Sequence, residues 1–179
     1  TADYARIVQF FWLNDERIGF YKQPTRGLDA YDLWAIDIDG KNLKKLVPGK
    51  WEDGYATGAS VSFLMDDDPD HVLIEYNKRR PKYTDIYKLN IYSGRLTTLA
   101  IDPVLGNNTL MGWAIDQQGN VRGYMAMDGL KYKLYHRNDV NKDFELLREF
   151  TYQEAMFMPQ TYDYDCLLYT SPSPRDEQS

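Results

Sequence analysis

An internal repeat of about fifty residues is the feature that most limits how this chain can fold. A tetrad made of an aromatic residue, two variable residues and an aspartate occurs four times, at steps of 51, 50 and 49 residues: Trp12–Asp15, Phe63–Asp66, Trp113–Asp116 and Tyr162–Asp165. A fixed period of this length is typical of proteins that place equivalent modules side by side. The repeat therefore predicts several similar units in place of one irregular core.

Each unit reads as a set of short antiparallel strands. After each of the first three tetrads come a polar turn and a second apolar run, which predict three hairpins with second strands at Ile18–Tyr21, Val72–Tyr76 and Val121–Tyr124. A third strand follows, because Asp32–Ile38 aligns with Asp85–Ile91, 53 residues later, and more weakly with Tyr132–His136. Alternate side chains of such a strand share one face, as Trp34, Ile36 and Ile38 do.

A fourth strand closes each unit. It is marked by Leu43-x-x-Leu46, Leu96-x-x-Leu99 and Leu147-x-x-Phe150, and turns such as Asp39-Gly40 and Ser93-Gly94 precede it. Four antiparallel strands in about fifty residues are the content of one propeller blade. The predicted fold class is therefore all-β, a partial β-propeller with about three four-stranded antiparallel blades, at 5–50, 57–103 and 107–152, plus the first strand of a fourth at 153–165. A β-sandwich or jelly roll is the rival, but neither has a reason to repeat the same marks in order.

Composition restricts the function classes. The chain is 43% apolar and 15% aromatic, which suits strands, and its formal net charge of −6 argues against a nucleic-acid partner. No apolar stretch approaches the length of a membrane span, and the longest candidate is Phe10–Leu13. The sequence begins at Thr1 without a signal-like segment, so no compartment is predicted.

The C-terminal segment differs abruptly from the repeats. Residues 166–176, CLLYTSPSPRD, resemble the conceptual translation of a sequencing-library adapter, and Ser171–Pro174 interrupts the strand pattern. We therefore expect residues 166–179 to be a non-native tail and residues 1–165 to be the propeller part. A natural disordered C-terminus is the alternative, and in both cases no function is expected of Cys166, the one cysteine of the chain.

Two stretches carry a resemblance to a known family. Asp67–Ile74 and Asp85–Arg95, taken with the repeats, resemble the propeller domain of bacterial prolyl-oligopeptidase-family serine peptidases of the dipeptidyl aminopeptidase and acylaminoacyl peptidase kind. The resemblance implies a propeller of seven or eight blades over an α/β-hydrolase domain of the same chain, which admits peptide substrates. It implies that the propeller partners that hydrolase domain, and it transfers no catalytic residue to this chain.

The sequence itself offers no nucleophile elbow. A hydrolase of this kind needs Gly-x-Ser-x-Gly, and the nearest string, Gly54–Gly58, has Ala56 at the nucleophile position. We expect this string to be a loop that leads into the second blade. His71 follows Asp70 and is expected to make a turn or capping contact, and His136 is expected to be structural.

Acidic runs raise the question of a metal. Asp66–Asp70 has consecutive aspartates before a proline, and Asp37–Gly40 lacks the spacing of an EF-type loop, so turn chemistry explains both better than calcium does. We therefore expect no catalytic, cofactor-binding or metal-binding residues in this chain. The rival function is a stand-alone TolB-like or WD40-like propeller that binds proteins, since a fold does not fix a function.

Overall fold

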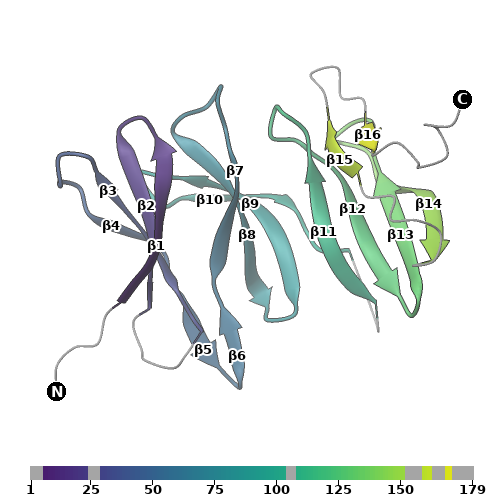
Figure 1. Ribbon diagram of the computed structural model, residues 1–179, viewed down its shortest axis with the longest axis horizontal. Coiled ribbons are helices and arrows are strands. Elements are labelled where there is room, and N and C mark those ends of the chain that lie inside the picture. Colours follow the sequence, from purple (N-terminus) through teal and green to yellow (C-terminus); the bar gives the residue numbers. More distant parts are fainter. Residues whose placement is uncertain (1–5, 24–28, 104–107, 152–158, 163–167, 171–179) are drawn as a thin grey trace, which may run out of the picture. The chain divides into compact units, whose positions relative to one another are not determined.

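The computed structural model describes residues 6–23, 29–103, 108–151, 159–162 and 168–170. These residues form β-strands, turns and extended segments without any helix, which confirms the all-β prediction (Figure 1). In consequence, they contain no helix long and apolar enough to cross a membrane.

Three sheets of four antiparallel strands make up most of the protein. In each one the strands follow chain order, so each is a simple meander, and we call the sheets blades 1, 2 and 3. Blade 1 contains β1 (Arg6–Asn14), β2 (Arg17–Gln23), β3 (Asp32–Asp37) and β4 (Lys44–Val47). Blade 2 contains β7 (Ala59–Leu64), β8 (His71–Arg80), β9 (Tyr83–Asn90) and β10 (Leu96–Ala100). Blade 3 contains β11 (Thr109–Ile115), β12 (Val121–Asp128), β13 (Lys131–His136) and β14 (Glu145–Thr151). These blades are those of a partial β-propeller.

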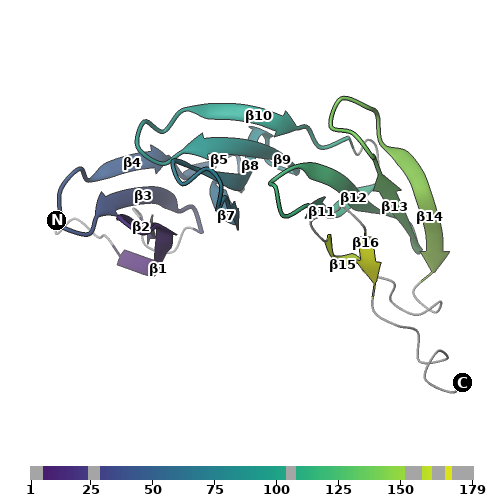
Figure 2. The same ribbon diagram turned by 90° about the horizontal axis from the view of Figure 1, so that it is seen from above.

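Blades 1 and 2 belong to one compact unit, residues 1–102, and share one core. Figure 2 shows β4 and β10 along one edge of this unit and β1 and β7 along the opposite edge, so the two sheets have the same orientation. Side chains of both sheets form a single buried cluster, which contains Leu13, Leu33, Ala35, Leu46 and Val47 of blade 1 and Ala59, Val72, Ile74, Tyr76, Tyr87, Leu89 and Ile91 of blade 2. Apolar burial of this extent is the main stabilising contribution to such a unit.

A buried aspartate at the start of the third strand recurs in blades 1 and 2. Asp32 Oδ1 accepts a hydrogen bond of 2.8 Å from the Gly49 amide, and Asp85 Oδ1 accepts one of 2.8 Å from the Asp102 amide. Both the acceptors and the donors are 53 residues apart, so the repeat predicted from sequence extends to specific hydrogen bonds. Each aspartate fixes the segment that leaves the fourth strand.

A β-bulge recurs in the fourth strand of all three blades. One residue of the pairing with the third strand is skipped each time, and these residues are Leu46, Leu99 and Leu147. A bulge adds one residue to one strand and so reverses which face the following side chains occupy. In the structure, Leu147 therefore occupies the same position in its blade as Leu46 and Leu99 do in theirs. The Leu-x-x-Leu spacing in the sequence instead aligns Leu147 with Leu43 and Leu96.

Blade 3 lies in the second unit, residues 103–179, and has a side-chain cluster on each face. On one face Tyr124 stacks on Tyr135 with ring centroids 4.6 Å apart, and Trp113 and Phe144 pack on Tyr124 edge to face. The other face buries Met125, Leu134 and Phe150. Aromatic pairs in these geometries add to the stability that their burial supplies.

Two further hairpins lie outside the three blades. Gly54–Gly58, expected to be a loop, lies largely in a hairpin of β5 (Lys50–Glu52) and β6 (Tyr55–Thr57). Asp53 and Gly54 both have positive φ at its turn, as a two-residue hairpin requires. Within 153–165, β15 (Pro159–Tyr162) pairs with β16 (Leu168–Thr170), which belongs to the segment expected to be a non-native tail. Cys166 and Asp163–Asp165 lie outside the described residues.

Candidate functional site

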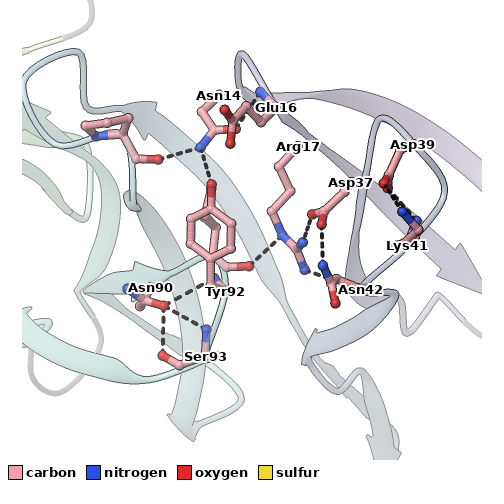
Figure 3. Close-up of polar contacts among 12 residues, drawn as sticks. Asn14, Glu16, Arg17, Asp37, Asp39, Lys41, Asn42, Asn90, Tyr92 and Ser93 are labelled. Atoms are coloured by element: carbon pink, nitrogen blue, oxygen red, sulfur yellow. Dashed lines mark hydrogen bonds and ion pairs between the residues drawn. The ribbon is translucent and has the colours of Figure 1, made fainter.

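The most elaborate polar arrangement in the described residues joins the loop ends of blades 1 and 2. It involves the β1–β2 turn, the β3–β4 turn, the turn before β8 and the turn after β9 (Figure 3). Polar turns meet here because both sheets place the same hairpin ends on the same side of the unit. We refer to this arrangement as the blade junction.

Arg17 is the centre of the blade junction, although its side chain is only 1% exposed. Its Nε donates to the carbonyl oxygen of Ile91 at 2.9 Å, and its Nη2 donates to the carbonyl oxygen of Asn42 at 3.0 Å. Nη1 forms an ion pair with Asp37, and the guanidinium lies 5.1 Å from the ring centroid of Tyr92. A buried charge of this kind is tolerated because it is paired and because each of its three nitrogens donates a hydrogen bond.

Asn14 makes the second link across the blade junction. Its Nδ2 donates to the carbonyl oxygen of Pro69 at 2.9 Å and to the Tyr92 hydroxyl at 3.0 Å, while its Oδ1 accepts from the Glu16 amide at 3.0 Å. One side chain thus binds two turns of blade 2 and the turn of its own blade. Tyr21 adds a third link deeper in the unit, since its hydroxyl accepts from the Val61 amide at 2.8 Å.

An acidic groove of about 720 Å³ lies beside these contacts. Trp12, Leu64 and Met65 supply apolar lining, and four carboxylates line the remainder: Asp15, Glu16, Asp66 and Asp70. The lining residues, all within the described ranges, include neither lysine nor arginine. The groove therefore carries a negative potential, which favours cations over anions.

His71 makes a turn contact, as the sequence predicted, and its partner is Asp68. Nδ1 is 2.7 Å from Asp68 Oδ1, and Nε2 is 3.3 Å from the Asn90 amide nitrogen. Lys88 binds the other carboxylate oxygen at 2.5 Å. The Lys88 and His71 hydrogen bonds lower the pKa of Asp68, so this carboxylate stays ionised. Both ring nitrogens of His71 are occupied, which leaves neither one directed at a nucleophile.

The remaining candidates from sequence have structural surroundings. His136 lies on β13 opposite Gly123 and Glu145, and burial, followed by the nearby Arg122 charge, lowers its pKa. Asp66–Asp70 forms a turn in which the Asp68 amide donates to Met65 and the His71 amide donates to Asp68. Across the described part of the chain, no three histidine, cysteine, aspartate or glutamate side chains are grouped to hold a metal ion.

Sequence reasoning did not identify the blade junction. Asp32 and Asp85 were aligned at 53 residues, and this spacing was the signal for their shared role. Arg17 gave no such signal, because the residue 54 positions later is His71. Its partner Ile91 is 74 residues away, and only the packing of two sheets brings them together.

Comparison with known proteins gives one distant relative. The chain is 30% identical over 100 residues to dipeptidyl aminopeptidase BIII of Pseudoxanthomonas mexicana, a match that covers 55% of this chain. The chain covers 14% of the length of that protein. No protein-family model matches the chain, and no solved structure matches it either. The fold and this similarity together support a distant relation to the prolyl-oligopeptidase-family peptidases.

Proposed function

We propose that this chain is the non-catalytic propeller part of a prolyl-oligopeptidase-like serine peptidase. The observation that carries the proposal is the 30% identity to a dipeptidyl aminopeptidase in a chain that folds into propeller blades. An α/β-hydrolase domain elsewhere in the same polypeptide supplies the nucleophile, the general base and the oxyanion hole. The parent protein is then a hydrolase of peptides.

The propeller contributes by steric selection. A rigid array of blades beside a catalytic domain admits extended peptides and excludes folded proteins, and its rigidity depends on contacts between successive blades. The blade junction supplies such contacts through Arg17 and Asn14. No catalytic role is proposed for the residues of this chain.

The parental gene provides the first test. We expect its reading frame to encode a Gly-x-Ser-x-Gly elbow in an α/β-hydrolase domain and to depart from residues 166–179 after Asp165. The purified parent should react with a fluorophosphonate probe and release the chromophore of a dipeptidyl p-nitroanilide. A gene that ends shortly after its last blade, with no such domain, would refute the proposal and favour a stand-alone protein-binding propeller.

Steric selection has its own test in the parent enzyme. Arg17→Met should loosen the blade junction, so it should raise cleavage of long peptides relative to a dipeptidyl p-nitroanilide by at least several-fold. Lys41→Met, which removes an exposed ion pair with Asp39, is the matched control and should leave this ratio unchanged. An unchanged ratio in a demonstrably destabilised Arg17→Met enzyme would contradict gating by the propeller.

A further inference from the structure

Blade 1 has an apolar face directed away from its core with blade 2. This outer face is formed by Phe10, Trp12, Ile18, Phe20, Trp34 and Ile36. Phe10 is 76% exposed and Trp12 is 57% exposed. Phe20 stacks on Trp34 at 6.4 Å, and Lys22 and Lys45 lie over the Trp34 ring at 5.2 and 5.3 Å. A contiguous apolar surface of this kind marks a contact with another protein segment.

Strand register shows what the outer face corresponds to in blade 2. In blade 1, the row of cross-strand partners is Phe10, Phe20 and Trp34. The corresponding row in blade 2 is Val61, Ile74 and Tyr87. The next row repeats the correspondence, because Trp12, Ile18 and Ile36 match Leu64, Val72 and Leu89. Cross-strand partners share one face of a sheet, so whole rows are equivalent.

The equivalent face of blade 2 is the one that packs on blade 1. Val72, Ile74 and Leu89 are fully buried there, in the same cluster as Leu13, Leu33 and Ala35 of blade 1. For blade 2, the side chains that cover this face are therefore known, and they belong to blade 1. That sheet presents small and aliphatic side chains together with the aromatic pair Phe11 and Tyr21.

Backbone groups at the rim of the outer face repeat as well. The Ile38 amide donates to the carbonyl oxygen of Glu16, as the Ile91 amide donates to that of Asp70. In blade 2 the Ile91 carbonyl accepts from Arg17, and the Val61 amide donates to the Tyr21 hydroxyl. By the same register, the Ile38 carbonyl of blade 1 corresponds to the Ile91 carbonyl of blade 2. The Phe10 amide corresponds to the Val61 amide.

We propose that the outer face of blade 1 is the docking site for another four-stranded blade of the same polypeptide. That blade presents an aliphatic face like that of Leu13, Leu33 and Ala35, an arginine for the Ile38 carbonyl and a tyrosine hydroxyl for the Phe10 amide. The occupant is intramolecular because blade 2 is covered by the blade that precedes it in its own chain, and because the chain spans only 14% of its longer relative. The inference rests on the repeat and on the greater length of the relative, and it does not require the parent protein to be a peptidase.

Radical footprinting of the full-length parent protein and of the 179-residue chain tests the proposal. Hydroxyl radicals oxidise exposed tryptophan, and a dosimeter normalises the two samples. We expect Trp12 and Trp34 to be oxidised at least ten-fold more slowly in the parent. Equal rates in both proteins would overturn the proposal. If Trp12 and Trp34 are protected in a parent protein that lacks a hydrolase domain, the docking proposal stands and only the peptidase proposal is refuted.

Photo-crosslinking identifies the occupant. The parent is made with p-benzoylphenylalanine at Phe10, or at Val8 if the first variant fails to fold, and ¹⁵N-labelled and unlabelled copies are mixed before irradiation. We expect crosslinks within one copy, to a strand of a further blade. Crosslinks between differently labelled copies would show a second copy as occupant and would overturn the proposal. The same crosslinker at Ile101, which follows β10 in blade 2 and is 55% exposed, should not reach that strand.

Discussion

The Nε of Arg17 donates to the carbonyl oxygen of Ile91 at 2.9 Å, across 74 residues of sequence. This bond links the second strand of blade 1 to the residue that follows the third strand of blade 2. The same guanidinium holds Asp37 and the Asn42 carbonyl, so one buried cation fixes both its own blade and its neighbour.

Replacement of Arg17 with methionine tests the energetic weight of the blade junction. The variant keeps an apolar stem but leaves the Ile91 carbonyl and Asp37 without their partner, and we expect a loss of about 2–4 kcal/mol in the free energy of unfolding. Urea unfolding at neutral pH measures this loss. Lys41→Met, at an exposed pair, should change stability by less than about 0.5 kcal/mol. Equal effects for the two variants would show that the junction adds no stability.

Asp85 provides a second test, within blade 2. Its carboxylate is 0% exposed, binds Arg79 Nε and Nη2 at 3.1 and 3.0 Å and accepts from the Asp102 amide. Asp85→Asn removes the charge that this network requires, and we expect a loss of about 3 kcal/mol. Asp67→Asn, in an exposed turn, is the control. A similar urea midpoint for both variants would mean that the repeated aspartate is dispensable.

The repeat made much of the fold predictable, but not the polar contacts between blades. Aromatic tetrads and alternating apolar runs predicted three four-stranded meanders, because burial on one face dictates side-chain periodicity. The β5–β6 hairpin was missed, since Lys50–Thr57 lacks a long apolar run and only Asp53-Gly54 indicates its turn. Arg17 was missed for a different reason: polar long-range pairs have no periodicity that a single sequence displays.

Glu75 predicts a pH dependence of stability. It lies on β8 beside fully buried Ile86, and burial raises its pKa above the usual value near 4.5. The folded state therefore holds this proton at pH values where the unfolded state has lost it, so the contribution of Glu75 to stability falls as pH rises from the unfolded value through the folded one.

Glu75→Gln should remove that fall. The variant should gain stability over the natural protein as pH increases from 4 to 8, with little difference at pH 4. Thermal unfolding across this range measures the effect, and Glu145→Gln, exposed on β14, is the control. A constant offset between variant and natural protein at all pH values would rule out titration of Glu75 as the cause.

The outer face of blade 1 predicts the solution behaviour of the 179-residue chain. Bare apolar side chains on a sheet face favour association between copies. We expect light scattering to increase with protein concentration and Phe10→Lys to reduce this increase at least two-fold. Leu130→Lys, which changes an apolar turn residue that is even more exposed than Phe10, should have a much smaller effect. A monomeric natural chain at all concentrations would contradict this account of the face.

The shared core of blades 1 and 2 is the basis of both the propeller assignment and the proposals that follow from it. Methyl NOE spectroscopy on selectively labelled protein tests it most directly, through the isoleucine, leucine and valine methyl groups of one blade and those of the other. We predict NOEs between blade 1 and blade 2 from the following residues: Leu13, Leu33 and Val47 to Val72, Ile74 and Ile91. NOEs within each blade, such as Val72 to Leu89, with none between the blades would contradict the account.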